Sequence, residues 1–171
     1  PFIRRVIAKN PSKFTYHGTG TYIVGSGDVA VIDPGPISDS HREALIAALA
    51  GERVRAILVT HCHSDHSPLA AWLREWSGAP TVAFGPHAIS SGWVEDDTPH
   101  EPDEEEKAAA AAAEAAGEAK VEESLDLAFD PDRRVADGEV AAAGEGWTLR
   151  AIHTPGHTSN HLCFWLEEQR A

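Results

Sequence analysis

The stretch Thr60-His61-Cys62-His63-Ser64-Asp65-His66 brings four potential metal ligands together within six residues. It directly follows residues 54–59, a mostly apolar run that is typical of a buried β-strand. The loop after such a strand is where an α/β scaffold usually carries its chemistry. This loop is therefore the first candidate for a functional site.

The four side chains favour metal binding by both type and spacing. His61 and His63 are two residues apart, so in an extended segment their side chains point the same way. Asp65 and His66 follow where the chain enters the next helix. Zinc and similar metals favour neutral imidazole and carboxylate ligands, and the directions of these four suit two adjacent cations better than one. Cys62 lies between the first two histidines and faces away from them, so we interpret it as a small buried residue.

A second stretch, Thr154-Pro155-Gly156-His157-Thr158, supplies a further ligand. Its Pro-Gly pair forces a turn directly after a strand, so His157 is presented at a strand end, as His61 is. His157 is therefore the natural third ligand for the first cation. His153 and His161 compete for this role, although each alone is more simply explained as a packed or hydrogen-bonding histidine.

Asp33 ends another apolar strand and precedes Pro34-Gly35-Pro36. By residue type alone, its simplest interpretation is a turn-forming Asp before a proline. Its position at a strand end also makes it a candidate hydrogen-bonding partner of a metal-ligating histidine.

Strand and helix patterns alternate along the chain, which predicts an α/β protein whose sheet is covered by helices. We expect one helix to be capped by Ser38 or Asp39 and stopped by Gly51, and a second to end at Gly78. The tryptophans are expected mainly in the core. The expected strands cover residues 21–24, 29–32, 54–59, 81–84, 147–152 and 161–166, with an alternating β pattern at 125–129.

Length and composition predict one domain over residues 1–171, with an acidic, alanine-rich insertion at about 95–124. The insertion is most simply a solvated excursion, and its functional alternatives are an acidic docking segment or a lid. The formal charge of −13 argues against nucleic-acid binding by bulk electrostatics. No apolar run approaches the roughly 20 residues that span a bilayer. Two cysteines are too few for a disulfide framework, which predicts a cytoplasmic protein.

Four motifs together resemble the metallo-β-lactamase superfamily, in the branch that includes glyoxalase II-like hydrolases and the β-lactamase-like protein 2 group of endoribonucleases. The resemblance covers most of the chain except the insertion. The motifs are Gly18–Val24, Val31–Gly35, His61–His66 and Thr154–His161.

This resemblance implies an αββα sandwich with two metals between its sheets. Two zinc ions are expected in the complete family site. Iron or manganese is compatible with the same ligands, and iron would allow oxygenase chemistry on a thiol. In the family a bridging Asp and a last His follow the strand that matches residues 161–166, so we expect this chain to hold the N-terminal part of the fold only. The implied ligands are His61, His63 and His157 for the first metal, and Asp65 and His66 for the second.

The implied function is that of a metal-dependent hydrolase, in which a metal-bound hydroxide attacks an ester, thioester or lactone in a small-molecule substrate. Asp65 would also act in catalysis, by orienting the nucleophile or accepting its proton. An alternative within the superfamily is an endoribonuclease or phosphodiesterase, which the acidic charge disfavours. An alternative of another class is a non-catalytic metal-binding fragment that lacks the bridging Asp.

Overall fold

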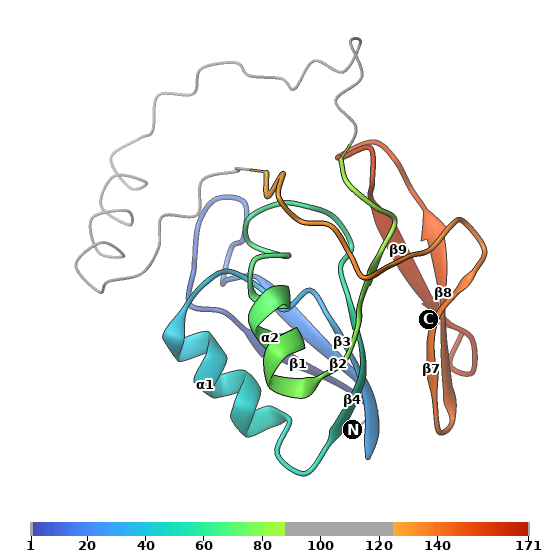
Figure 1. Cartoon of the computed structure of the whole chain (residues 1–171). Helices are drawn as coiled ribbons and strands as arrows, with labels where there is room; N and C mark the ends of the chain where they lie inside the picture. The colour runs from blue at the N-terminus through green and yellow to red at the C-terminus, as the bar shows by residue number, and fades with distance from the viewer. Residues whose placement is uncertain (1, 88–124, 171) are drawn as a thin grey trace.

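The computed structural model describes residues 2–87 and 125–170, and within them the strands form two sheets (Figure 1). The larger sheet has the order β1-β2-β3-β4-β5-β6 and the smaller one the order β7-β8-β9. The strands are β1 (Ile3–Ile7), β2 (Gly20–Ser26), β3 (Asp28–Ile32), β4 (Arg53–Leu58), β5 (Thr81–Ala83), β6 (Arg133–Arg134), β7 (Val140–Gly144), β8 (Trp147–His153) and β9 (Leu162–Leu166).

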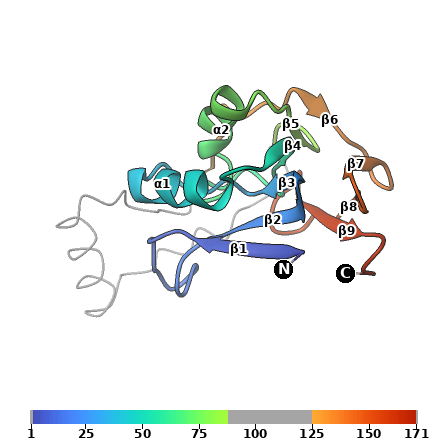
Figure 2. The ribbon, with the colours of Figure 1, turned by 90° about the horizontal axis from the view of Figure 1, so that it is seen from below.

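The larger sheet is mixed. β1, β2 and β3 pair antiparallel, whereas β3, β4, β5 and β6 pair parallel. Neighbouring parallel strands need a crossover, and α1 (Asp39–Ala48) and α2 (Leu69–Ser77) supply it before β4 and before β5. Both helices lie on one face of the larger sheet, and the smaller sheet lies across the other face (Figure 2). Among the described helices, none is long and apolar enough to cross a membrane.

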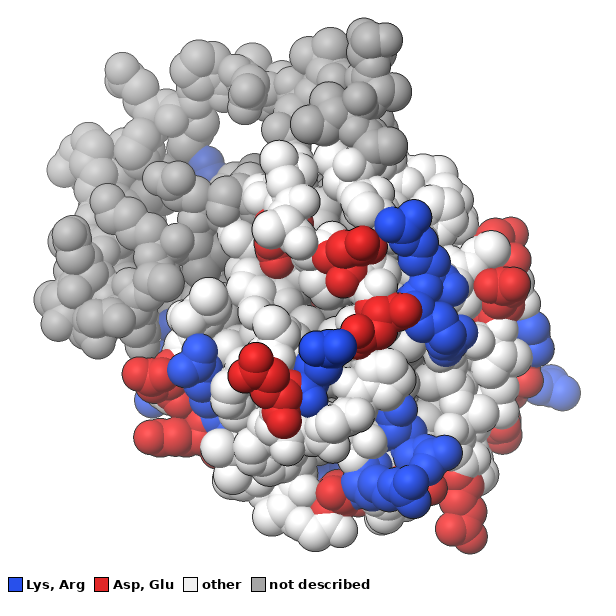
Figure 3. Space-filling model, in the orientation of Figure 1, with Lys and Arg blue, Asp and Glu red and all other residues white. Residues whose placement is uncertain are grey.

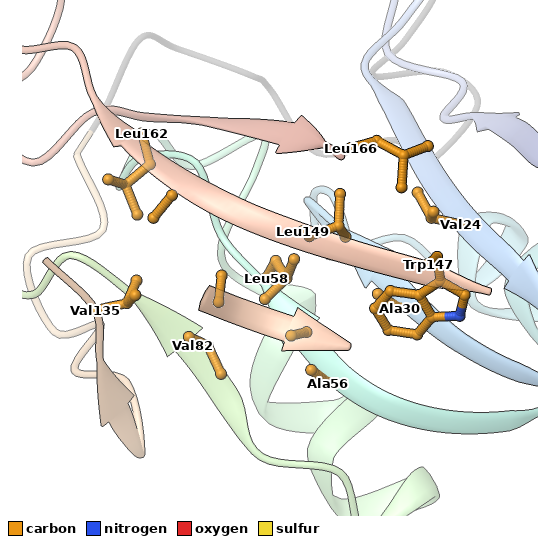
Figure 4. Packing of buried hydrophobic residues seen from close by; sticks show 13 residues of the cluster. Val24, Ala30, Ala56, Leu58, Val82, Val135, Trp147, Leu149, Leu162 and Leu166 are labelled. Atoms are coloured by element: carbon orange, nitrogen blue, oxygen red, sulfur yellow. The ribbon is translucent and has the colours of Figure 1, made fainter. Parts of the chain in front are cut away.

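Two hydrophobic clusters hold these layers together because strands of the larger sheet are apolar on both faces. Ile23 and Ile57 belong to the cluster under the helices, while their neighbours Val24 and Leu58 belong to the cluster between the sheets. Figure 4 shows this second cluster, in which Trp147 packs between the sheets near Val24 and Ala30. The resulting order of helices, larger sheet and smaller sheet confirms the predicted layering and matches the N-terminal part of an αββα sandwich.

Two of the predicted helix boundaries are confirmed, whereas α1 ends before the predicted stop at Gly51, at Ala48, with Leu49 as its C-cap. Ser38 caps α1, because its side-chain oxygen accepts a hydrogen bond from the backbone N–H of His41. α2 ends at Gly78, which adopts the left-handed conformation with φ of 72° that favours glycine. Strand β1 was not expected from the sequence, since its five residues, Ile-Arg-Arg-Val-Ile, do not alternate between apolar and polar.

The predicted strand pattern at 125–129 is wrong. Only Leu125 makes a β-bridge, to His63, and the chain turns at Asp126, whose carbonyl accepts a hydrogen bond from the Phe129 amide. Asp126 instead braces the histidine loop, since its amide donates to the Cys62 carbonyl at 2.6 Å. The alternation of apolar residues along the sequence cannot reveal that a backbone amide is hydrogen bonded to a distant segment of the chain.

The expectation for the tryptophans holds only in part. Trp147 is 1% exposed and lies in the core, but the exposed fractions of Trp76 and Trp165 are 44% and 39%. Trp76 lies in the last turn of α2. Trp165 lies in β9, whose only neighbour among the described strands of the smaller sheet is β8. The proposed insertion at 95–124 and Trp93 lie outside the described residues.

Trp147 is expected to dominate the packing between the sheets. Its indole N–H donates to the Asp28 carbonyl at 3.0 Å, and a Cβ at Gly144 would collide with its ring. We predict that Trp147→Ala lowers the free energy of unfolding by about 3–5 kcal/mol. Trp165→Ala is the matched control, with an expected loss below about 1 kcal/mol. Urea denaturation would contradict this account if the two variants lost equal stability.

Asp132 connects α2 to the strand layer. It accepts hydrogen bonds from Arg74 Nε at 2.7 Å and from the Thr81 amide at 2.9 Å, and these lower its pKa from 3.8 to about 2. Because the pKa of Asp132 is lowered, its ionised carboxylate stabilises the fold at pH values above the ordinary pKa of 3.8. This stabilisation is lost as the pH falls through the lowered pKa of about 2. We predict that Asp132→Asn lowers the free energy of unfolding by about 1–3 kcal/mol at neutral pH.

The exposed pair of Asp130 and Arg134 provides the control for this prediction. Asp130→Asn should change the free energy of unfolding by less than about 1 kcal/mol. In urea titrations between neutral pH and pH 2, the difference between wild type and Asp132→Asn should shrink with acidity. A difference that stayed constant would contradict the role assigned to the Asp132 carboxylate.

Candidate metal centre

Two loops, one after β4 and one between β8 and β9, meet at one edge of the layered structure. The Leu162 amide donates to the Thr60 carbonyl at 2.8 Å and so joins the start of β9 to the loop after β4. This contact brings His157 beside His61 and His63. One ligand atom of each histidine lies within 4.8 Å of those of the other two. A zinc ion lies about 2 Å from each histidine nitrogen, so the three imidazoles are close enough to converge on one shared cation after a small movement of the side chains.

The three histidines differ in exposure. His61 and His63 are buried, with exposed fractions of 5% and 8%, whereas His157 is exposed. The ring of His157 lies 4.9 Å from that of His61 and 4.5 Å from that of His63, measured between centroids. The cluster is therefore enclosed by the protein at His61 and His63 and accessible to a ligand at His157.

Thr60 determines which nitrogen of His61 faces the cluster. The Thr60 hydroxyl donates its proton to Asp33 Oδ2 at 2.8 Å, so it must accept a proton from His61 Nδ1, at 2.9 Å. The lone pair of His61 is then on Nε2, which is buried without a hydrogen-bond partner among the described residues. A buried, unpartnered acceptor costs free energy, and a metal ion is the partner that a neutral imidazole nitrogen takes. The residues present therefore fit a bound cation.

The pKa values agree with a neutral cluster. Burial is the main factor that lowers the pKa of His61 to about 2, and the nearby His66 and His63 rings lower it further. Burial likewise lowers the pKa of His63 to about 4, with a further contribution from His157. Both buried histidines are therefore unprotonated at neutral pH, which is the state that binds metal.

Asp65 and His66 form the neighbouring part of the site. His66 lies between two carboxylates, with Nδ1 at 3.0 Å from Asp33 Oδ2 and Nε2 at 3.3 Å from Asp65 Oδ2. Burial acts to lower the pKa of His66, but hydrogen bonds to Asp33 and Asp65 outweigh it and raise the value to about 10. Burial acts to raise the pKa of Asp65, but His66 and Thr19 outweigh it and lower the value to about 2. The proton between His66 and Asp65 occupies a position that a cation could take.

Asp33 contacts both halves of the site. Its Oδ1 accepts from the Thr60 amide at 2.8 Å, and its Oδ2 accepts from the Thr60 hydroxyl and faces His66. Its backbone has φ of 52°, a left-handed conformation that Asp tolerates better than most residues. Thr21 supports this conformation by donating its hydroxyl to the Asp33 carbonyl at 2.7 Å. The position agrees with the predicted role as a partner of ligand histidines, which remains a proposal.

The two competing histidines have other contacts. His153 stacks on Phe84, with 3.9 Å between ring centroids, and its Nε2 contacts the Ser159 carbonyl at 2.9 Å. The Nδ1 atom of His161 contacts the Thr154 hydroxyl at 2.8 Å. Neither belongs to the cluster of closely spaced ligand atoms among the described residues. The geometry therefore favours His157 as the third histidine.

Several supporting residues were missed from the sequence. Thr60 had a signal only as the first residue of the histidine motif and Thr19 only as part of the Gly18–Val24 motif, and Asp126 had no signal at all. Asn160 is also buried, and its amide donates to the Gly85 carbonyl at 2.9 Å, which ties the His157 loop to the larger sheet. The only available signal was the density of polar residues beside the histidine motifs.

Comparison with known proteins identifies the family. A sequence profile described as the metallo-beta-lactamase superfamily matches residues 16–171. The chain belongs to the metallo-beta-lactamase superfamily, as its motifs predicted.

Curated relatives align with the whole chain. It is 31% identical to the lactamase-like protein ptaB of Pestalotiopsis fici, and the alignment covers 100% of the chain and 43% of the relative. It is also 31% identical to the atrochrysone carboxyl ACP thioesterase dmxR1 of a Cryptosporiopsis species, over 100% of the chain and 42% of that protein. The chain thus spans less than half the length of these relatives.

Solved structures show the same fold. A metallo-beta-lactamase from Cronobacter sakazakii, with a mutated HARLDQ motif, aligns with a TM-score of 0.61 at 23% identity, covering 99% of this chain and 58% of the other. The subclass B3 metallo-beta-lactamase BJP-1 of Bradyrhizobium japonicum aligns with a TM-score of 0.58 at 24% identity, covering 88% and 51%. At these identities the likeness concerns the fold alone.

Asp33 offers a direct test of the site. We predict that Asp33→Asn lowers the affinity of the chain for zinc by about 10–100-fold, because an amide nitrogen replaces one of the oxygens that accept from Thr60 and face His66. Asn tolerates the left-handed backbone, so the fold should persist. The exposed Asp39→Asn is the control. Unchanged zinc affinity in a calorimetric titration of Asp33→Asn would remove Asp33 from the site.

Proposed function

We propose that this chain carries the metal centre of a metal-dependent hydrolase. The observation that carries the proposal is the cluster of His61, His63 and His157, in which the lone pair of His61 is buried and has no partner among the described residues. Membership of the metallo-beta-lactamase superfamily supports the same conclusion. The activity of a longer protein containing this chain is part of the proposal.

Five side chains would hold the cations. His61, His63 and His157 would hold the first, and Asp65 and His66 would contribute to the second. Zinc fits this donor set of imidazole and carboxylate. Bound divalent cations would supply activation of water and polarisation of the scissile bond. The environment of the histidines also suits this chemistry, since a buried site strengthens electrostatic interactions.

The chain's own residues have distinct roles in this proposal. Asp65 is ionised at neutral pH and lies beside the cluster, so it can orient a water molecule. Its lowered pKa makes it a weak acceptor for the proton of that water, so orientation is the role favoured here. Thr60 and Asp33 fix the orientation of His61 and His66 through hydrogen bonds at 2.8–3.0 Å. The open side at His157 is the direction from which a substrate can approach.

We favour a thioester as the substrate bond. Relatives that are about 30% identical over the whole chain are named atrochrysone carboxyl ACP thioesterases, from Cryptosporiopsis and from Aspergillus chevalieri. A thioester also suits the chemistry, because a thiol has a pKa near 8.5 and can leave as thiolate without a strong general acid. Esters and lactones belong to the same proposed class of acyl substrates.

A phosphodiesterase acting on RNA is the second candidate. The net charge of −13 opposes binding of a polyanion. On the face shown in Figure 3, basic and acidic side chains are interspersed, and no continuous basic surface crosses that face. These observations favour the acyl substrate.

Metal content tests the first part of the proposal. We predict about one zinc per chain after purification without added metal, and loss of that zinc in His61→Ala and His63→Ala. His17→Ala, which changes an exposed histidine outside the cluster, should retain it. Elemental analysis gives the ratio. A folded chain without metal, or equal loss in all three variants, would contradict the proposal.

A substrate panel tests the second part. The zinc-loaded chain is assayed against an acyl-thioester, an ester, a lactone and a single-stranded RNA. We expect turnover of the thioester that is abolished in His61→Ala and kept in His17→Ala. Turnover of RNA alone would favour the phosphodiesterase. Absence of turnover with all four substrates, despite bound zinc, would support the non-catalytic alternative for this chain.

A further inference from the structure

Asn10 and Thr19 form a buried polar pair beside Asp65. Thr19 directly precedes β2, Asn10 lies in the loop between β1 and β2, and their exposed fractions are 6% and 9%. The Thr19 hydroxyl donates to Asp65 Oδ2 at 2.7 Å, across 46 residues of sequence. A buried Thr is more often satisfied by its own backbone, so a hydrogen bond to a distant carboxylate of the candidate site requires an explanation.

The direction of every hydrogen bond in this pair is determined by chemistry. The Thr19 backbone N–H can only donate, so the Asn10 side-chain atom at 2.9 Å from it must be the oxygen, Oδ1. The Asn10 nitrogen, Nδ2, therefore faces Thr19 Oγ1, at 2.9 Å, and donates to it. Thr19 has a single hydroxyl proton, and Asn10 supplies no acceptor for it on that side. The proton is therefore directed to Asp65.

The backbone around the pair fixes it in place. The Ala8 amide donates to the Thr19 carbonyl at 2.9 Å. Gly18 has φ of 125°, and a Cβ at this position would collide with the Ala8 carbonyl. The hydroxyl of Thr15 donates to the Asn10 carbonyl. Both partners are thus held before they contact Asp65, so the hydrogen bond imposes an orientation on the carboxylate rather than following it.

We propose that Asn10 and Thr19 are positioning residues that orient the Asp65 carboxylate toward His66. The inference rests on the proposed function, since it deepens the role given there to Asp65 as a donor to the second cation. Asp65 Oδ2 is the oxygen that Thr19 contacts and also the one that lies 3.3 Å from His66 Nε2. Without the Thr19 hydroxyl, the Asp65 carboxylate can rotate about its broad terminal torsion. Asp65 and His66, the two proposed ligands of the second cation, then lose their alignment.

Three variants separate positioning from simple packing. Thr19→Val keeps the branched shape and removes the hydroxyl, whereas Thr19→Ser keeps the hydroxyl. Asn10→Asp keeps the shape of the side chain but replaces the donor Nδ2 with a second acceptor, so the single proton of Thr19 should turn from Asp65 to residue 10. Thr148→Val, in β8 of the smaller sheet, is the control for a threonine outside the site.

The first readout needs no metal. The carboxyl ¹³C signal of Asp65 is compared at neutral pH in the metal-free chain and its variants. We expect the signal to shift in Thr19→Val and in Asn10→Asp, and to return to the wild-type position in Thr19→Ser. An unmoved signal in Thr19→Val, with an intact fold, would overturn the proposal whether or not the chain binds a cation.

The second readout is titration with Co²⁺. We expect the first equivalent, at the three histidines, to bind unchanged in all variants, and any second equivalent to bind about 10–100-fold more weakly in Thr19→Val and Asn10→Asp. The added negative charge of Asn10→Asp would by itself strengthen cation binding, so weakening identifies the lost orientation. Equal weakening of both equivalents would overturn the proposal. Failure of the unsubstituted chain to bind any Co²⁺ would refute the proposed function instead, and the carboxyl signal would then decide the role of Asn10 and Thr19.

Discussion

The Asp33 carboxylate joins the two halves of the candidate site, because it is hydrogen bonded to Thr60 and faces His66. Through Thr60 it orients His61 so that a lone pair faces the cluster, and directly it holds His66 against Asp65. A buried carboxylate must have such partners, because an unpaired charge in the interior costs several kcal/mol. The hydrogen bonds that stabilise Asp33 therefore also orient His61 and His66, two of the side chains proposed to bind cations.

The layered fold explains why these groups meet. β3 and β4 are neighbouring parallel strands, so the residues that follow them, Asp33 and Thr60, emerge at the same edge of the larger sheet. The smaller sheet packs on the other face through the cluster around Trp147, and this packing brings the loop of His157 to that edge. Burial around the cluster then lowers the pKa of His61 and keeps it neutral. Packing between the two sheets thus determines both the positions of the three histidines and the burial that keeps His61 neutral.

Much of the architecture could be predicted from local patterns. Ser38 and Gly78 mark helix ends because caps and left-handed turns have strong residue preferences. The pattern at 125–129 failed because Asp126 is used to brace the histidine loop, and a backbone contact of this kind leaves no trace in side-chain alternation. The prediction that tryptophans lie in the core was wrong for the exposed Trp165, because hydrophobicity alone does not say which face of a strand is covered.

The sequence by itself determined the family, the layered α/β class and the residue types that can bind a cation, because spacing within one loop and turn chemistry are local properties. It also named His157 without separating it fully from His153 and His161. Only the tertiary structure decided that choice, since it depends on which ring reaches His61 and His63 across the two sheets. It likewise revealed the hydrogen bonds of Thr60, Asn10 and Thr19. The roles proposed for these residues depend on the direction of single protons, and that direction is fixed only when residues far apart in the chain are brought within hydrogen-bond distance.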